Sequence, residues 1–456
     1  MEENMGAINT RNIILDILTE INENGAYSDK VLSAALCKYQ YLSHADRAFI
    51  SRVVMGSVER RLTLDYIADA YSKVPTRKMK PLIRNIMRMS VYQIIYMDGV
   101  EDFAACNEAV KLAQKRGFCS LKGFVNGVLR NIAREKDRLP MPDKKDVCAY
   151  FSVKYSTPEW IVDRWLEQYG EADTEKILAA QYDERPLTIR CNSARISPEE
   201  LTDRLLASGI RVSSLPYLPE ALAIEGYDYL EKIEEFREGL FSVQDLSSMF
   251  VGHIAAPPKG AYVVDVCAAP GGKSLHIAEL LNGTGYVEAR DLTPAKISLI
   301  EENISRLGLG NIKAAAADAT VRDGALAGKA DIVLADLPCS GLGIIGRKPD
   351  IKYNASGDGC ISLTALQREI LGVVCEYVKP GGILIYSTCT LNQQENEENA
   401  RWFADSFDFE PESLEGYIPK ELCPDTARLG YAELLPGVTG KGFDGFFIAK
   451  FRRKAR

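Results

Sequence analysis

The chain has 456 residues, of which 46% are hydrophobic and 26% charged, a composition that excludes the disordered and fibrous classes. Its formal net charge is −8, but residues 1–140 hold 21 Lys and Arg against 16 Asp and Glu, so a basic first segment precedes an acidic remainder. This distribution is compatible with local RNA contact and equally with an ordinary solvated face.

The chain carries no sign of a membrane or export segment. No apolar run approaches the roughly 18–20 residues that span a bilayer. The acidic start MEENMGAINTRN lacks the basic and apolar pattern of a signal peptide. We therefore expect a cytoplasmic protein with no membrane partner.

Residues 1–142 are predicted to form an all-α domain. The apolar side chains of TRNIILDILTEINENG recur at helical spacing, and no strand pattern interrupts the segment. Two prolines and a cluster of charges in LPMPDKKD then indicate a domain boundary. Further helices are expected over residues 30–39, 47–71, 79–97, 105–117 and 121–137.

Residues 143–240 have a mixed pattern. Helices are expected over 156–170 and 197–209, and strands over 186–192 and 221–226. We interpret this segment as a small α/β module that serves as a linker or as an RNA-binding module.

Residues 241–456 alternate strand and helix patterns. This alternation predicts crossover units and a doubly wound, mostly parallel, Rossmann-like sheet, in which ligands bind at the carboxyl ends of the strands. The expected strands are 261–268, 285–292, 311–319, 331–338, 381–389 and 445–453. The expected helices are 273–281, 294–308, 362–378 and 393–407.

A glycine-bearing turn, DVCAAPGGKS, follows the first strand of this segment. It lacks the first glycine of the phosphate-binding loop GxxxxGK[ST], because Cys267 stands five positions before Gly272, and it lacks the dinucleotide fingerprint GxGxxG. The next two strands end in Asp291 and Asp318, where carboxylates can accept from ribose hydroxyls and from an adenine amino group. Each acid alone is as easily a cap or turn residue, but together they predict an adenosine site without a pyrophosphate site. S-adenosylmethionine fits that description.

Two cysteines stand at the ends of the fourth and fifth strands, in ADLPCSG and YSTCT. Most cysteines only pack in cores, but Cys339 and Cys389 at adjacent strand tips suggest chemistry. A thiolate that adds to carbon 6 of a cytosine activates carbon 5 toward a methyl sulfonium. Asp336 could bind the N3/N4 edge of the base. Lys273 could reach the base, or could equally be a solvated lysine at a helix start.

The other cysteines suggest neither disulfides nor a metal centre. The chain has eleven, with no CxxC pair, and only three histidines, His44, His253 and His276. We expect no metal site, and nothing indicates an obligate protein partner.

The combination of CAAPGGKS, DLPCSG, YSTCT and SVQDLSSM resembles the RsmB (Sun, Fmu) family of bacterial 16S rRNA cytosine-5 methyltransferases, within the NOL1/NOP2/Sun group. The resemblance extends over the whole length. NEAVKLAQKRG and KGFVNGVLRNIAR are similar to the RNA-binding antitermination factor NusB.

The resemblance implies specific roles. Cys389 would be the nucleophile and Cys339 would promote product release; residue reasoning alone leaves their order open, because DNA cytosine methyltransferases attack with the cysteine of the PC motif. The substrate would be one hairpin-loop cytosine of 16S rRNA, cytosine 967 in the family. S-adenosylmethionine would be bound by Cys267, Ala268, Ala269, Pro270, Gly271, Gly272, Lys273, Asp291, Asp318 and Asp336.

Some positions depart from the family pattern. Leu337 follows the aspartate of the fourth motif, ARD precedes Leu292, and GRKPDIKY replaces the usual RHPDIKW, so that Arg347 and Lys348 could contact RNA differently. Two alternatives stay open: the same chemistry on tRNA, and a non-catalytic RNA-binding or antitermination factor. Retention of both thiols speaks against the second.

Overall fold

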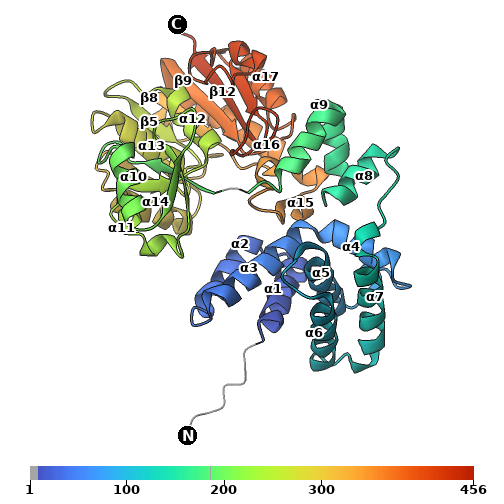
Figure 1. Cartoon of the computed structure of the whole chain (residues 1–456). Helices are drawn as coiled ribbons and strands as arrows, with labels where there is room; N and C mark the ends of the chain where they lie inside the picture. Colours follow the sequence, from blue (N-terminus) through green and yellow to red (C-terminus); the bar gives the residue numbers. More distant parts are fainter. Residues whose placement is uncertain (1–8, 185, 456) are drawn as a thin grey trace. The chain divides into compact units, whose positions relative to one another are not determined.

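A computed structural model describes residues 9–184 and 186–455, which form two compact units (Figure 1). The first unit runs to Ala179 and also includes Arg347–Asn354. The second comprises Ala180–Gly346 and Ala355–Arg456. None of the helices in the described ranges is long and apolar enough to cross a membrane.

The first unit is built from helices around one apolar core. In α1, all six isoleucine and leucine residues are buried, including those that the helical spacing predicts. The helices are α1 (Thr10–Asn24), α2 (Ser28–Lys38), α3 (His44–Glu59), α4 (Arg61–Ala70), α5 (Pro81–Tyr96), α6 (Asp102–Lys115), α7 (Lys122–Arg134), α8 (Val147–Lys154), α9 (Glu159–Ala180) and α15 (Ile351–Asn354), with 3₁₀ turns η1 (Thr76–Lys78), η2 (Cys119–Leu121) and η3 (Lys136–Arg138).

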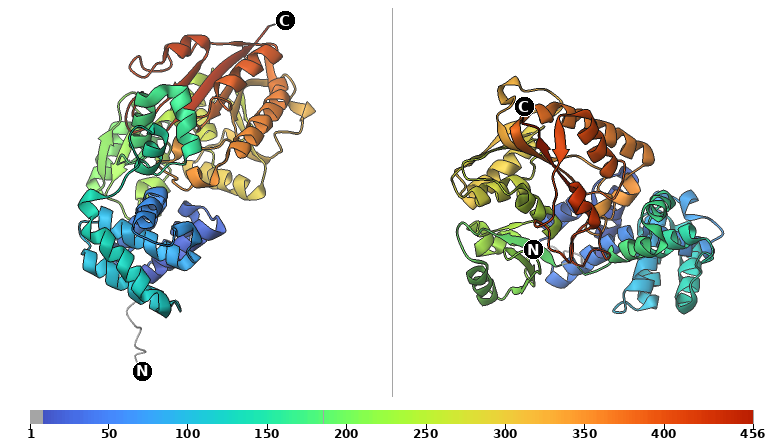
Figure 2. Two further views of the ribbon diagram at one scale, coloured as in Figure 1. Left: turned by 90° about the vertical axis from the view of Figure 1, so that its right-hand side faces the viewer. Right: turned by 90° about the horizontal axis from the view of Figure 1, so that it is seen from above.

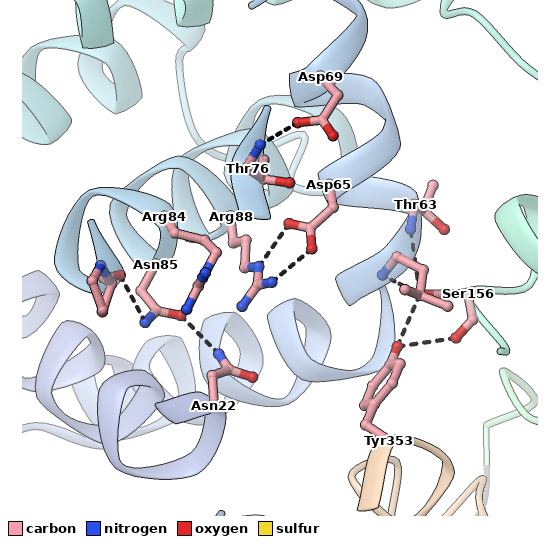
Figure 3. A network of polar contacts seen from close by, with 12 residues as sticks. Asn22, Thr63, Asp65, Asp69, Thr76, Arg84, Asn85, Arg88, Ser156 and Tyr353 are labelled. Atoms are coloured by element: carbon pink, nitrogen blue, oxygen red, sulfur yellow. Dashed lines mark hydrogen bonds and ion pairs between the residues drawn. The ribbon is translucent and has the colours of Figure 1, made fainter. Parts of the chain in front are cut away.

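The single helix expected over residues 47–71 is wrong, because the chain breaks at Arg60 into α3 and α4. The break exposes backbone N–H groups at the start of α4, and the Ser156 hydroxyl accepts from the N–H of Leu62 at 2.9 Å (Figure 3). A partner 94 residues away in the sequence therefore stabilises the break, and no local pattern could predict it.

Polar contacts inside the first unit bind the inserted segment 347–354 to the helices. The Tyr353 hydroxyl lies 3.0 Å from Ser156 Oγ, and Lys352 Nζ donates to the Glu59 carbonyl at 3.0 Å. Nearby, Arg88 makes a bidentate ion pair with Asp65 at 2.7 and 2.6 Å (Figure 3). The segment that carries the PDIKY motif thus belongs to the helical unit, although the chain on both sides of it belongs to the second unit.

The second unit starts with a four-stranded antiparallel sheet of order β2-β3-β1-β4. Its core is formed by the sheet with α10 and α11. Its elements are β1 (Leu187–Cys191), α10 (Pro198–Ala207), β2 (Arg211–Ser214), β3 (Ala221–Glu225), η4 (Leu230–Lys232), α11 (Glu234–Arg237) and β4 (Phe241–Val243).

An eight-stranded sheet follows, of order β10-β12-β9-β8-β5-β6-β7, with β11 paired to β12 (Figures 1 and 2). The strands from β9 to β7 are parallel, and β12 is antiparallel to β9. The strands are β5 (Tyr262–Asp265), β6 (Tyr286–Asp291), β7 (Ile312–Ala316), β8 (Ala330–Asp336), β9 (Val378–Thr388), β10 (Phe409–Pro411), β11 (Tyr431–Leu434) and β12 (Phe446–Arg453).

Helices cover both faces of this sheet. Val263 and Leu334 pack in one core with α12, α13 and α14, whereas their neighbours Val264 and Val333 pack in another with α16 and α17. The helical elements are α12 (Leu246–Ala255), α13 (Gly272–Leu281), α14 (Pro294–Leu307), η5 (Gly324–Leu326), η6 (Leu342–Ile344), α16 (Gly357–Val374), η7 (Cys375–Tyr377), α17 (Glu397–Ser406) and η8 (Asp425–Leu429). The predicted doubly wound, Rossmann-like class is confirmed, and the strand order reverses between β5 and β8, where such sheets bind ligands.

Candidate active site

The predicted cofactor loop joins β5 to α13 beside this switch point. The Ala268 N–H donates to the Arg290 carbonyl at 2.8 Å, and the Ala269 N–H donates to Asp291 Oδ2 at 2.9 Å, so the loop is fastened to the end of β6. Gly271 has a φ of +109°, which side chains rarely tolerate, and it starts α13 with no side chain over the turn. The loop leaves its backbone open to a close ligand.

The two predicted adenosine acids differ in their surroundings. Asp291 is buried at the tip of β6, and its Oδ1 accepts from the Leu292 N–H at 2.7 Å and from Lys296 Nζ at 2.8 Å. Asp318 follows β7, is exposed, and accepts from the N–H and hydroxyl of Thr320 at 2.9 and 2.7 Å. Asp318 therefore closes its own turn, and of the two only Asp291 is built into the loop that follows β5.

A partly buried ion pair crosses the switch point. Lys273 Nζ donates to Asp336 Oδ2 at 2.7 Å, and the Ser387 hydroxyl donates to Asp336 Oδ1 at 2.7 Å. Burial lowers the pKa of Lys273, but the charge and hydrogen bond of Asp336 outweigh burial and raise it, so the lysine stays protonated. The Lys273 ammonium also lies 5.1 Å from the centroid of the Phe446 ring.

A buried carboxyl lies behind this pair. Asp265 ends β5 and accepts from the Ser274 hydroxyl. Burial raises the pKa of Asp265 to about 7, and the charge of Asp336 adds to the rise. The loop therefore encloses acidic groups, and its one lysine is engaged by Asp336.

The two predicted thiols meet at the tips of adjacent strands. Asp336 of β8 and Ser387 of β9 are register partners, and the chains that continue from them bring Cys339 Sγ and Cys389 Sγ to 3.4 Å. The hydrogen bond to Cys389 and burial raise the pKa of Cys339 well above its usual range, so Cys339 is a neutral thiol. Lys273 is near enough to interact electrostatically with Cys389.

A buried glutamate that the sequence analysis did not single out positions the Cys339 loop. Glu395 accepts from the Ser340 N–H at 2.9 Å and from Gln367 Nε2 at 3.0 Å, and Asn392 donates to its other oxygen at 2.8 Å. Gln367 Nε2 also donates to the Pro338 carbonyl at 2.8 Å. The polar run QQENEEN resembles a solvated helix start, so its composition gave no signal of this role.

Two glycines bring the Cys389 backbone against the neighbouring loops. The Gly343 N–H donates to the Cys389 carbonyl at 3.1 Å, and the Gly445 N–H donates to the Gly343 carbonyl at 2.9 Å. A Cβ atom on Gly343 would lie 2.8 Å from the Cys389 carbonyl oxygen and closer still to Gly445. The close approach of three chain segments here requires the absence of a side chain.

The site therefore gathers Cys389, Cys339, Asp336 and Lys273 at the tips of β8 and β9 and the start of α13, and the loop of residues 267–272 lies between Asp291 and Lys273. The individual roles assigned to these residues remain predictions. Burial raises the pKa of Cys267, the cysteine of that loop, so it stays a neutral thiol.

Three family models match this chain. The 16S rRNA methyltransferase RsmB/F model matches residues 253–452, the NusB family model residues 8–134, and the ferredoxin-like domain of RsmF/B-like methyltransferases residues 157–228. The chain is 37% identical over 99% of its length, and 100% of the relative's, to the probable ribosomal RNA small subunit methyltransferase B of Bacillus subtilis. It is 34% identical to the protein of that name in Synechocystis, over 98% and 100%.

The chain belongs to the ribosomal RNA small subunit methyltransferase B family. In agreement, the crystal structure of PH0851 superposes with a TM-score of 0.80 at 25% identity and covers 98% of this chain and 100% of its own. The resemblance drawn from the motifs is thereby confirmed, including the NusB-like first domain. The family models divide the chain in three, whereas α8 and α9, assigned from sequence to the middle module, pack into the helical unit up to Ala179.

Proposed function

We propose that this protein methylates carbon 5 of one cytosine in 16S rRNA, with S-adenosylmethionine as methyl donor and Cys389 as nucleophile. The observation that carries the proposal is the pair of thiols 3.4 Å apart at the ends of two adjacent parallel strands, beside the Lys273–Asp336 pair. Packing alone does not require two cysteines at the ligand-binding end of such a sheet.

The loop after β5 fits S-adenosylmethionine better than a nucleotide phosphate. In a P-loop the lysine of GK[ST] reaches the phosphates, whereas Lys273 is committed to Asp336 and the buried Asp265 lies behind it. Such acidic surroundings suit the positively charged sulfonium of the cofactor, whose methyl group is the electrophile. Asp291 would accept from the ribose hydroxyls, Asp318 would meet the adenine, and Cys267 through Lys273 would line the site.

Cys389 begins the reaction in this proposal. Its thiolate forms a bond to carbon 6 of the cytosine, and the enamine that results attacks the methyl group through carbon 5. Asp336 can accept from the N4 amino group, because each of its oxygens has a lone pair left after binding Lys273 and Ser387. Lys273 supplies positive charge beside the site as charge builds on the ring.

Cys339 acts after methyl transfer. A solvent base takes the carbon 5 proton, with the neutral Cys339 thiol placed to assist by hydrogen bonding. The electron pair of that C–H bond restores the double bond between carbons 5 and 6, while the bond between carbon 6 and Cys389 breaks and returns its electron pair to the sulfur. Lys273 lies within electrostatic reach of Cys389, which supports Cys389 as the thiol that attacks first. This order agrees with the roles that the family resemblance implies.

The substrate follows from the family. The curated relatives are named for ribosomal RNA of the small subunit, so we infer 16S rRNA and, by the family's pattern, cytosine 967. The NusB-like unit would hold the RNA. We expect no metal in the chemistry and action in the cytoplasm.

The test is transfer of a radiolabelled methyl group from S-adenosylmethionine to unmodified 16S rRNA and to unmodified tRNA. We expect label in the 16S rRNA as 5-methylcytosine at one position. Label in tRNA alone would give the chemistry another substrate. No transfer, with RNA binding intact, would favour the non-catalytic antitermination role and contradict the proposal.

A further inference from the structure

Two of the three histidines meet a glutamate away from the active site. Glu220 precedes β3, His253 lies in the last turn of α12, and His276 lies in the middle of α13. One ligand atom from each side chain lies within 4.8 Å of the other two. The sequence predicts no metal site, because histidines are few. The fold nevertheless brings together two histidines that are 23 positions apart and a glutamate that precedes β3 of the antiparallel sheet.

The geometry of the three side chains fits one small cation. His253 Nε2 is 2.5 Å from Glu220 Oε1, and His276 Nε2 is 3.9 Å from the same oxygen. The ring centroids of the two histidines are 5.5 Å apart. Zinc bonds of roughly 2.0–2.2 Å in a tetrahedron place neighbouring ligand atoms about 3.3 Å apart. That separation lies between the two observed ones, so small side-chain rotations would reach it.

The buried imidazole of His276 also points to a ligand. It is only 2% exposed, its Nδ1 has no hydrogen-bond partner in the described part of the chain, and its Nε2 faces Glu220 beyond hydrogen-bond distance. Because Nδ1 faces α12, Nε2 is the ring atom that is directed toward Glu220 and can bind a ligand.

The space and the charge beside the cluster also suit a cation. A cavity of about 290 Å³ adjoins it and leaves room for a water ligand. Arg190, which lines the same cavity, is paired with Glu279 through hydrogen bonds of 2.8 and 3.1 Å. Glu220 is the carboxylate of the cluster and supplies negative charge to a divalent ion.

We propose that Glu220, His253 and His276 bind a Zn²⁺ ion, with water as the fourth ligand. Two imidazoles and one carboxylate are a ligand set that zinc accepts. The ion would join β3 of the antiparallel sheet to α12 and α13 of the catalytic sheet. Because α13 starts at Gly272 and carries Lys273 in its first turn, the ion would stiffen the helix that presents Lys273 to Asp336.

The close packing of α12 on α13 supports this role. A Cβ atom on Gly252 would lie 2.5 Å from His276 Nδ1, so the His276 ring is pressed against α12 and its Nε2 edge is directed toward Glu220. The position of the imidazole is therefore set by helix packing before any ion arrives, which is the preorganisation that a metal site needs.

The experiment titrates ZnCl₂ into the full chain, free of any histidine tag and with Cys389→Ser to remove the thiol pair as a competing site. The histidine ring signals are followed by NMR, and the melting temperature is recorded with and without zinc. The chain has three histidines, so each ring signal is assigned by substituting one histidine at a time. We expect one equivalent of zinc to shift two of the three signals and to raise the melting temperature.

The variants decide the outcome. His253→Gln should lower zinc affinity by more than the roughly 10- to 100-fold that loss of a supporting outer partner costs, and Glu220→Gln should do the same. His44→Gln, which changes an exposed histidine on α3, should leave binding unchanged. His276→Ala removes a core side chain, so His253→Gln and Glu220→Gln carry the test if that variant fails to fold. Zinc binding that persists in both, or no shift of any histidine signal, would overturn the proposal.

Discussion

At the scale of single residues, the two thiols are chemically distinct although they are neighbours. The hydrogen bond to Cys389 and burial hold Cys339 in its neutral form by raising its pKa, while the Lys273 ammonium lies within electrostatic reach of Cys389. A neutral thiol can assist a proton transfer but is a poor nucleophile. The Lys273 charge within reach of Cys389 is the physical reason for assigning attack to Cys389.

The two cysteines should therefore fail in different ways when substituted. Cys389→Ala should abolish methyl transfer and form no covalent complex. Cys339→Ala should permit methyl transfer and then stall, so that the protein accumulates as an adduct with methylated RNA. A denaturing gel, with and without nuclease, measures this. An adduct with Cys389→Ala but not with Cys339→Ala would reverse the roles, and lowered melting temperatures without adducts in either would leave both as packing residues.

Asp291 should be the acid that matters for the cofactor. Asp291→Ala should weaken S-adenosylmethionine binding at least about tenfold, because an ionised acceptor of two hydroxyls is removed. Glu288→Gln is the control: Glu288 already binds Tyr262 and Arg290 within β6 and its neighbour, so its substitution should not change cofactor affinity. Calorimetric titration compares the two, and equal affinities would remove the assignment.

At the scale of elements, every strand expected from an apolar run is present, because buried strands, parallel or antiparallel, have apolar runs in their sequences. The strands β2, β4, β10 and β11 were missed. Each has only three or four residues, too few for an alternating pattern to stand out. The same limit applies to the site: the strand tips were predictable, whereas Glu395 acts through partners 28 and 55 residues away and leaves no local trace.

The packing of the η6 loop on the Cys389 backbone gives a test at this scale. Gly343→Ala should displace the Cys389 carbonyl or Gly445, because the added Cβ has no room, and should lower activity at least about tenfold. Gly357→Ala is the matched control, since a Cβ atom there meets nothing within 4 Å. Initial rates of methyl transfer to 16S rRNA and melting temperatures distinguish a site effect from unfolding. Equal rates for both variants would contradict the argument.

At the scale of the molecule, the helical unit includes the distant segment Arg347–Asn354, and this places the Lys352 side chain in its interior. Lys352 is 1% exposed, and burial lowers its pKa to about 7, with Glu59 opposing and Arg60 and Arg61 adding to the decrease. Between about pH 7 and the ordinary lysine value, the unfolded chain binds a proton there that the folded chain does not. The contribution of Lys352 to stability therefore increases as pH rises through this range.

Lys352→Met should reveal that dependence. The free energy of unfolding of the variant relative to the parent should be most favourable to methionine at and below pH 7 and should move against it by about 3–4 kcal/mol between pH 7 and pH 10. Removal of the hydrogen bond to the Glu59 carbonyl shifts the comparison by a constant amount and leaves the trend. Urea unfolding at several pH values measures it. A difference that does not vary with pH would mean that the lysine is charged in the folded chain.

RNA affinity is the last property that belongs to the molecule as a whole. The helical unit supplies the surplus of basic residues, and four of them, Lys73, Arg77, Lys78 and Lys80, stand exposed in and beside η1. Deleting residues 1–144 would be a poor test, because it also removes Ser28 and Glu59, which bind the 347–354 segment. Replacing the four side chains by glutamine keeps the fold and removes only charge.

The quadruple variant should bind 16S rRNA more weakly, while S-adenosylmethionine affinity stays unchanged. Each RNA phosphate that the variant can no longer neutralise should reduce the slope of log affinity against log salt by roughly 0.7–0.9, so the full set should reduce it by up to about 3. Filter binding over a range of salt concentrations measures the slope. Replacing four exposed basic residues of the second unit, Lys259, Lys313, Lys329 and Lys420, is the matched control for net charge. If the slope falls equally in both variants, total charge explains the effect, and the NusB-like unit is not the part of the chain that binds RNA.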